Sequence, residues 1–162
     1  MITLEVHLPT QRLLVIDEDK IIRDYPVSTA KNGAGEQAGS RQTPQGLHII
    51  RAKIGANCPV NTVFVKRRPT GEFYTPELRA ACPDRDWILT RILWLSGVEK
   101  NQNRLGDVDT FQRYIYIHGT NDEENIGTPR SHGCIRMRNQ DIIALFDCTK
   151  VGDCVYIQED NA

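Results

Sequence analysis

Short apolar runs separated by turn-forming residues recur along this chain of 162 residues. The first of them, residues 1–8, alternates apolar and polar side chains, which is the pattern of a half-buried β-strand. Similar runs cover 13–16, 21–26, 47–51, 63–65, 88–95, 114–118 and 154–158. The polar connection 17–20 predicts a hairpin between the second and third of these strands. We therefore expect a mainly β sandwich or barrel that forms one domain over residues 1–162.

One segment near the C-terminus departs from the β pattern. Apolar residues recur there at helical spacing, at Ile142, Ile143, Leu145 and Phe146. Asn139 precedes them and is predicted to be the N-cap of a short amphipathic helix. The segments 69–71 and 76–83 contain proline or glycine and are interpreted as connectors. The sequence thus predicts one or two short helices beside the strands.

Residues 27–41 form a long connection rich in glycine. Loops of this length inside a small domain often line a functional site. The turn Thr-Pro-Gln-Gly at 43–46 follows, in which the proline fixes one φ and Gly46 permits a positive one. His48 lies in the next predicted strand, and we expect it near the rim of the site.

The charge balance argues against nucleic acid as a partner. Lys and Arg total 20, against 21 Asp and Glu, and the net charge is −1. A nucleic-acid-binding domain would carry a clear excess of basic residues. The cluster Lys66-Arg67-Arg68 is interpreted as the solvated flank of a loop. No apolar run approaches the roughly 18 residues of a membrane span, so no membrane association is predicted.

The chain opens directly on its first predicted strand, without a charged and apolar leader segment before it. Its five cysteines are odd in number and widely spaced, which fits reduced thiols better than a disulfide framework. Both features lead us to expect a cytoplasmic protein. The alternative is a periplasmic protein whose leader was removed.

Cys134 is the strongest candidate for a catalytic residue. The run 131–137 reads Ser-His-Gly-Cys-Ile-Arg-Met, and His118 ends the predicted strand upstream. Because the thiolate is the nucleophile and free cysteine titrates near about 8.5, the chemistry needs an imidazole base, which we assign to His118. Gly133 has no Cβ, so the backbone N–H groups beside it can approach a reacting carbonyl and form an oxyanion hole.

Other interpretations of these residues carry less weight. His118, His132 and Cys134 have the side chains of a zinc site, but no fourth ligand stands at a recognisable spacing. Neither a metal nor another cofactor is therefore predicted. The other four cysteines have no histidine nearby in sequence and are interpreted as packing residues, Cys148 and Cys154 beside the final turn.

Three neighbours of Cys134 are candidates for substrate binding, each with a structural alternative. His132 either contacts the substrate or holds the nucleophile loop by a hydrogen bond. The Ser131 hydroxyl either bonds to the substrate or caps a turn. Arg136 either binds a substrate carboxylate or anchors the loop to an acid such as Asp141.

The segment 131–137, together with His-Gly-Thr at 118–120 and Thr-Pro-Gln-Gly at 43–46, resembles the catalytic domain of YkuD-type L,D-transpeptidases, the ErfK group. The resemblance runs from about residue 2 to residue 158. Two positions depart from the family pattern, because many members have asparagine in place of Arg136 and an aromatic residue in place of His48.

The resemblance implies a mixed β fold, with Cys134 as nucleophile and His118 as its partner. It also implies that the Gly119 carbonyl holds the other ring nitrogen of His118. The implied partner is a peptidoglycan stem peptide, a muropeptide, cleaved between the L-centre of the diamino acid at position three and the D-residue at position four. A carbapenem is expected to acylate the same cysteine.

The fate of the thioester intermediate separates two activities. Water yields a tripeptide, whereas an amine from a second stem yields a 3,3 cross-link. Because no leader precedes the first strand, we expect an L,D-carboxypeptidase that removes the terminal D-alanine from tetrapeptide stems during cell-wall recycling. The alternatives are a periplasmic L,D-transpeptidase and, from another class, an inactive module that binds stem peptides. The sequence predicts no oligomeric state.

Overall fold

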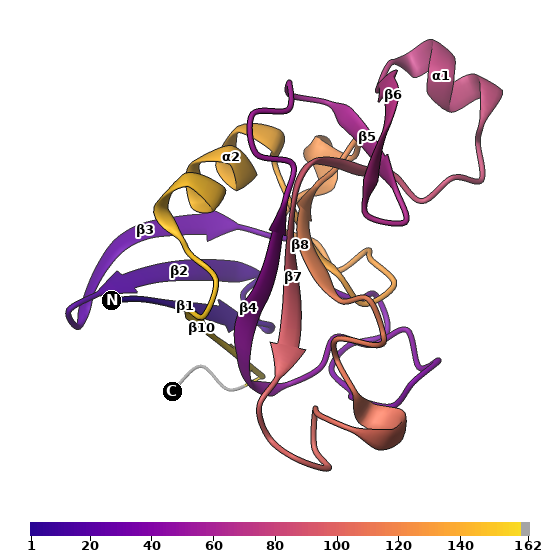
Figure 1. Cartoon of the computed structure of the whole chain (residues 1–162). Coiled ribbons are helices and arrows are strands. Elements are labelled where there is room, and N and C mark those ends of the chain that lie inside the picture. Colours follow the sequence, from indigo (N-terminus) through magenta and orange to yellow (C-terminus); the bar gives the residue numbers. More distant parts are fainter. Residues whose placement is uncertain (160–162) are drawn as a thin grey trace.

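The computed structural model describes residues 1–159, which contain one mixed sheet of ten strands, two α-helices and two short 3₁₀-helices, Gly106–Val108 and Glu123–Asn125 (Figure 1). The strands are β1 (Ile2–His7), β2 (Arg12–Asp17), β3 (Lys20–Pro26), β4 (Gly46–Ile54), β5 (Thr62–Val65), β6 (Arg68–Phe73), β7 (Ile88–Gly97), β8 (Tyr116–Gly119), β9 (Ile135–Met137) and β10 (Cys154–Gln158). The helices are α1 (Pro76–Ala81) and α2 (Asn139–Cys148). This confirms the predicted mainly β architecture; the last residues of the predicted domain, 160–162, lie outside the described part.

The strand order in the sheet is β3-β2-β1-β10-β4-β7-β5-β6, with β8 beside β7 and β9 beside β8. β10 runs parallel to β1 and antiparallel to β4. β8 and β9 are also parallel to each other. The predicted hairpin after β2 is present, and its turn is tighter than expected because only Glu18 and Asp19, both with positive φ, separate the strands.

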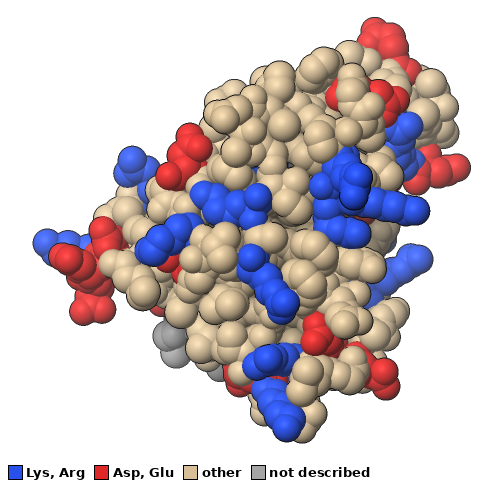
Figure 2. Space-filling model, in the orientation of Figure 1, with Lys and Arg blue, Asp and Glu red and all other residues tan. Residues whose placement is uncertain are grey.

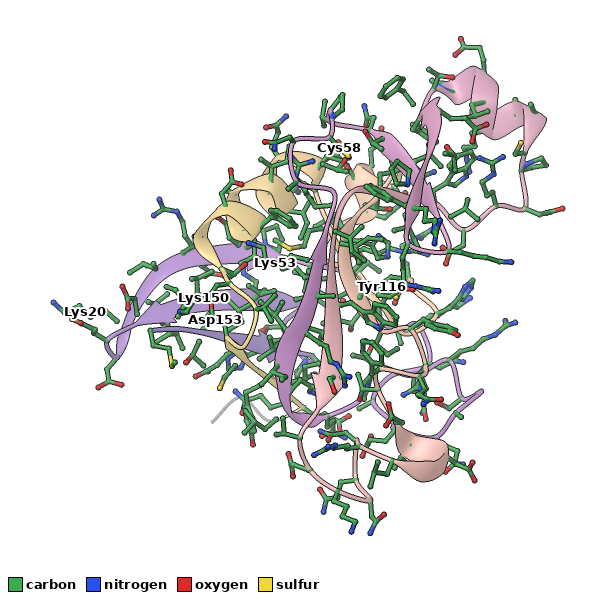
Figure 3. The ribbon with its side chains drawn as sticks, viewed as in Figure 1. Lys20, Lys53, Cys58, Tyr116, Lys150 and Asp153 are labelled. Atoms are coloured by element: carbon green, nitrogen blue, oxygen red, sulfur yellow. The ribbon has the colours of Figure 1, made fainter. Side chains whose placement is uncertain are left out.

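The helix α2 covers one face of the sheet and packs against β7 and β8 (Figure 1). Ile142, Leu145 and Phe146 are buried there, as their spacing predicts. Lys53 of β4 lies under the end of this helix (Figure 3), where its Nζ donates to the carbonyls of Phe146 and Thr149, both at 2.6 Å. These bonds satisfy carbonyls that a helix end otherwise leaves without a partner.

The start of α2 differs from the prediction. Its N-cap position is Arg138, not Asn139, and the Arg138 side chain makes no capping bond. The Glu123 carboxylate instead accepts the N–H of Asn139 at 2.8 Å. Asn139 itself is buried, and its amide group faces the sheet.

Two elements were interpreted from the sequence as connectors. The segment 68–73 is the edge strand β6, a position that tolerates Pro69 because one side of an edge strand has no ladder to complete. The segment 76–81 is the helix α1, where Pro76 opens the helix and the Thr75 hydroxyl accepts the N–H of Leu78. No helix within residues 1–159 is long and apolar enough to cross a membrane.

Candidate active site

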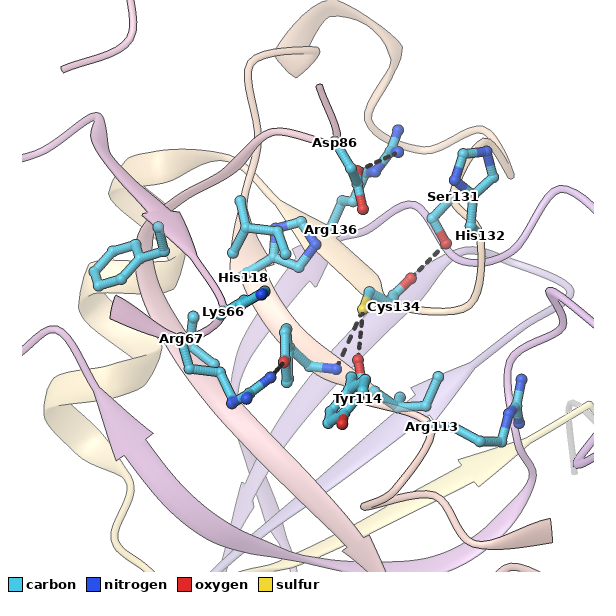
Figure 4. A pocket seen from close by; sticks show the side chains of 15 residues that line it. Lys66, Arg67, Asp86, Arg113, Tyr114, His118, Ser131, His132, Cys134 and Arg136 are labelled. Atoms are coloured by element: carbon cyan, nitrogen blue, oxygen red, sulfur yellow. Dashed lines mark hydrogen bonds and ion pairs between the residues drawn. The ribbon is translucent and has the colours of Figure 1, made fainter. Parts of the chain in front are cut away.

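The parallel pairing of β8 and β9 gathers four functional side chains on one face of the sheet. His118 lies opposite Arg136 in this pairing. Because side chains alternate along a strand, Tyr116 and Cys134, two positions earlier, share that face. All four line one pocket of about 420 Å³ (Figure 4). The intervening isoleucines are fully buried on the opposite face, in the core.

The Cys134 sulfur is held by backbone groups of the segment that leads into β8. It accepts the N–H of Tyr116 at 3.3 Å and donates to the Tyr114 carbonyl at 3.4 Å (Figure 4). Burial raises the pKa of this thiol to about 12, although the Tyr116 N–H works in the opposite direction. At neutral pH the resting sulfur is therefore a protonated thiol.

His118 is oriented by the backbone beside it. Its Nδ1 lies 2.6 Å from the Gly119 carbonyl oxygen, which is the contact that the family resemblance implies. A carbonyl can only accept, so Nδ1 carries the proton and Nε2 keeps its lone pair for the pocket. Burial lowers the pKa of His118, so the ring is neutral at pH 7 and is available as a base.

The nucleophile loop is closed by its own serine. The Ser131 hydroxyl donates to the Cys134 carbonyl at 2.5 Å and accepts the Gly133 N–H at 3.2 Å. Ser131 therefore acts within the turn, which is the structural alternative considered for it. The Gly133 N–H can contribute to an oxyanion hole only if it gives up its hydrogen bond to Ser131. That bond is weak, because 3.2 Å is the long limit for an N–H···O hydrogen bond.

Gly133 occupies a position that only glycine fits well. Its φ is +134°, and a Cβ there would lie 3.0 Å from Ile115 Cδ1 and 3.3 Å from the Gln42 carbonyl oxygen. The Thr43 hydroxyl fixes the same residue from the other side, since it donates to the Gly133 carbonyl at 2.9 Å. The turn at 43–46 thus supports the nucleophile loop directly.

The long loop 27–41 supports the site without lining this pocket, which corrects our expectation from its length. Ser28 forms a bridge with Arg136, and Ala30 forms one with Ser131. Arg113 attaches the loop to the segment before β8 by donating to the carbonyls of residues 35, 36 and 42. The loop therefore supports the segments that carry Cys134 without lining the pocket itself.

The two remaining candidates lie at the pocket with different surroundings. His132 is exposed and forms no hydrogen bond within residues 1–159, so Ser131 and Thr43 hold the loop instead. Arg136 pairs with Asp86 at 3.7 Å and not with Asp141, the acid that the sequence suggested (Figure 4). Asp86 lies in a polar connector before β7, where no sequence pattern marks it as a site residue.

Cationic residues dominate the pocket walls. Among residues 1–159, Lys66, Arg67, Arg113 and Arg136 line it, against the single carboxylate of Asp86. Figure 2 shows Lys and Arg side chains across the middle of one face of the molecule, with most acidic groups toward its edges. Lys66 and Arg68 are exposed, as expected for the solvated flank of a loop. Lys66 and Arg67 also line the pocket, which that interpretation did not include.

His48 and Cys148 also differ from their predicted positions. His48 is fully buried and lies away from the pocket, with Nδ1 3.0 Å from the Gly46 carbonyl oxygen and Nε2 3.0 Å from the Thr110 hydroxyl. Cys148 is exposed, whereas Cys154 is partly buried. All five cysteines are free thiols, and no group of three His, Cys, Asp or Glu residues within 1–159 is placed to hold a metal ion.

Comparison with known proteins gives a family match along almost the whole chain. The model of the YkuD L,D-transpeptidase catalytic domain matches residues 2–157. The putative L,D-transpeptidase YqjB of Bacillus subtilis (strain 168) is 51% identical over 49 residues, which are 30% of this chain and 28% of that protein. The probable L,D-transpeptidase YbiS of Escherichia coli (strain K12) is 34% identical over 114 residues, 65% of this chain and 35% of that protein. The match thus spans about a third of these relatives' length.

Solved structures share the fold. An L,D-transpeptidase from Mycobacterium smegmatis aligns with 97% of this chain and 58% of its own, with a TM-score of 0.58 and 19% identity. The L,D-transpeptidase LdtMt1, solved in complex with imipenem, aligns over the same shares with a TM-score of 0.59 and 18% identity.

Proposed function

The chain belongs to the YkuD family of L,D-transpeptidase catalytic domains, and from this we propose that it cleaves peptidoglycan stem peptides through a thioester on Cys134. One observation carries the proposal. The Cys134 thiol and the His118 ring line the same pocket, and the Gly119 carbonyl, 2.6 Å from Nδ1, leaves Nε2 of His118 free to accept a proton.

The geometry supports a simple sequence of bond changes. Cys134 Sγ attacks the carbonyl carbon that precedes the D-residue while its proton passes to Nε2 of His118. The carbonyl oxygen becomes an oxyanion, which N–H donors beside Gly133 can stabilise. The C–N bond then breaks, His118 returns the proton to the departing amine, and a thioester remains. Water activated by His118 hydrolyses the thioester and regenerates the thiol.

Charge favours hydrolysis over transfer in this pocket. The acceptor in a cross-linking reaction is an amine, and its ammonium form would have to approach a site lined by four cationic side chains and one carboxylate. Like charges in a cleft lower the local concentration of a cation, whereas water is unaffected. We therefore propose an L,D-carboxypeptidase that releases terminal D-alanine from tetrapeptide stems.

Two alternatives remain distinct proposals. The family and its named relatives favour an L,D-transpeptidase that forms 3,3 cross-links. A module that binds stem peptides without turnover is less favoured, because it has no use for an oriented His118 beside a thiol. A cytoplasmic location is part of the leading proposal and is supported by the five free thiols, which are typical of a reducing compartment.

Product analysis separates these functions. The purified protein is incubated with a diaminopimelate-containing tetrapeptide, with and without a second stem as amine acceptor, and the products are identified by mass. Hydrolysis predicts tripeptide and free D-alanine in both reactions. A dominant 3,3-linked dimer in the presence of acceptor would establish the transpeptidase instead.

The matched controls use two cysteines. Cys134→Ala removes the nucleophile and should lower turnover by at least about 10³-fold with little change in stability. Cys148→Ala alters an exposed thiol and should leave turnover unchanged. A carbapenem should add one acyl group to the parent protein and none to Cys134→Ala. An unmodified parent that releases no D-alanine would leave only the binding module.

A further inference from the structure

The tip of the β5–β6 hairpin places two cations where turn geometry favours other residues. Lys66 and Arg67 are the only residues between the strands, and their φ values are +49° and +64°. Two-residue turns of this type prefer asparagine or glycine, because other side chains are strained at positive φ. Both side chains nevertheless line the pocket (Figure 4), so the strained turn is placed at a candidate functional site.

Arg67 lies over two aromatic rings. Its guanidinium carbon lies 4.8 Å from the centre of the Trp94 ring and 4.7 Å from that of Tyr114. Its Nη1 also donates to the Tyr116 hydroxyl at 3.1 Å. A guanidinium positioned in this way has lost most of its rotational freedom before any ligand arrives.

Arg67 has no anionic partner within residues 1–159. None of the carboxylates in this described part lies within 4.0 Å of the Arg67 or Lys66 side chain, whereas Arg136 is paired with Asp86. Arg113 is also engaged, because backbone carbonyls accept its N–H groups. A guanidinium has five N–H donors, and Arg67 uses one of them. Its remaining donors can bind a planar anion in a bidentate manner.

We propose that Arg67 binds the C-terminal carboxylate of the peptide substrate, with Lys66 adding to the positive field. This rests on the proposed function, in which the departing group is a single terminal residue. Tyr116 links the two sites, since its N–H contacts the Cys134 sulfur and its hydroxyl contacts Arg67. A one-residue leaving group carries its carboxylate next to the attacked bond. Arg67 therefore selects peptides that end one residue beyond that bond.

Binding to a protein that cannot turn over tests this site. In the Cys134→Ala background, calorimetry compares the tetrapeptide with its C-terminal carboxamide. We expect the parent site to bind the carboxylate about 10- to 100-fold more tightly, as a charge-assisted bidentate contact allows. Arg67→Gln should reduce this preference to about 3-fold or less, and Arg67→Lys should retain part of it because it keeps the charge without the planar fork.

Arg68→Gln is the matched control, because Arg68 is exposed on the same hairpin and does not line the pocket. It should keep the full preference. Equal binding of acid and amide by the parent site, an intact preference in Arg67→Gln, or no measurable binding of the tetrapeptide would overturn the assignment. If the preference disappears in Arg67→Gln but the active protein releases no D-alanine, the carboxylate site stands and the proposed function fails. If Arg67→Gln keeps the preference for the carboxylate and the active protein releases D-alanine, the proposed function stands and the carboxylate site fails.

Discussion

Cys134 and His118 both rest in their uncharged forms at neutral pH. Burial raises the pKa of the thiol and lowers that of the imidazole, so each shift disfavours a preformed thiolate–imidazolium pair. Proton transfer to His118 must then accompany attack on the substrate. Asp86 carries a negative charge near both groups, which raises the pKa of each.

This resting state predicts how alkylation of Cys134 depends on pH. Because the pKa of the thiol is about 12, the rate with iodoacetamide should rise about tenfold per pH unit from 7 to 10 without a plateau. Asp86→Asn removes a charge that raises this pKa, so alkylation at a fixed pH should become faster. Peptide mapping by mass distinguishes Cys134 from the exposed Cys148. A plateau in the alkylation rate near pH 7 would instead show that Cys134 and His118 rest as a thiolate–imidazolium pair.

The two histidines beside the cysteine should respond differently to substitution. His118→Ala removes the proposed base and should slow single-turnover acylation by about 10² to 10⁴-fold. His132 is exposed and makes no hydrogen bond within residues 1–159, so His132→Ala should cost about tenfold or less, mainly in KM. Rapid-quench measurement with the tetrapeptide gives both values. The reverse ranking would exchange the roles of the two residues.

At the scale of elements, a β-bulge in β7 and the first residue of α2 together fix the end of β8. Register shifts between Leu89 and Ile92, where the buried Thr90 adopts φ +76°. The Thr90 hydroxyl donates to Asn139 Oδ1 at 2.6 Å, and Asn139 Nδ2 donates to the Thr120 carbonyl at 2.8 Å. The first residue of α2 thereby fixes the backbone that follows His118.

Asn139→Ala should therefore affect both stability and rate. It leaves the buried Thr120 carbonyl without its donor, which should cost about 1–3 kcal/mol of unfolding free energy in urea. The substitution also loosens the strand end that orients His118. At urea concentrations well below the unfolding midpoint, kcat should therefore fall by a larger factor than KM changes. Gln140→Ala, at the exposed neighbouring position, should change neither. A loss of stability with kcat intact would limit Asn139 to a packing role.

The elements that could be predicted are those with a local signal. The alternating runs predicted β1 to β3 and β10, and the apolar stripe predicted α2. Asn139 was expected to cap that helix, since its type and place fit an N-cap, but its amide is used by Thr90 and Thr120, which are distant in sequence. β6 and α1 were missed because their prolines resemble those of connectors when edge position and capping are unknown.

At the scale of the whole molecule, the pocket combines segments that the sequence does not connect. Cys134 and His118 could be found from their chemistry and from the motif around them. Asp86 and Arg67 could not, because they reach the pocket only through the pairing of β7 with β5 and β8. Their own sequence neighbourhoods are polar connectors without a distinguishing pattern.

His48 makes the stability of the whole fold depend on pH. Burial lowers the pKa of its ring to about 4 from an unperturbed value of 6.5. Between these values the unfolded chain binds a proton that the folded chain does not, so stability falls as pH drops from 6.5 to 4. The full loss of unfolding free energy, reached below both pKa values, is about 3 kcal/mol. Above pH 6.5 the His48 ring is neutral in both states, so it adds no further pH dependence.

His48→Gln should flatten that part of the pH profile. Urea unfolding at pH 7, 5.5 and 4 measures the difference between the parent and the variant, in which the titrations of other groups cancel. The variant should be less stable at pH 7, because the pair of bonds to Gly46 and Thr110 is disturbed, and the gap should narrow as pH falls. A constant gap at all three values would mean that His48 does not titrate as its burial indicates.

The central place of β10 has a consequence for synthesis on the ribosome. β10 separates β1 from β4, so it is the element that joins the N-terminal meander to the rest of the sheet. Until residues 154–158 emerge, β1 and β4 each present an unpaired edge to the cell. The nascent chain can form its hairpins early, but the sheet becomes continuous only when residues 154–158 have emerged. We therefore expect this protein to complete its fold after translation of the catalytic loop, with open strand edges as its most vulnerable stage.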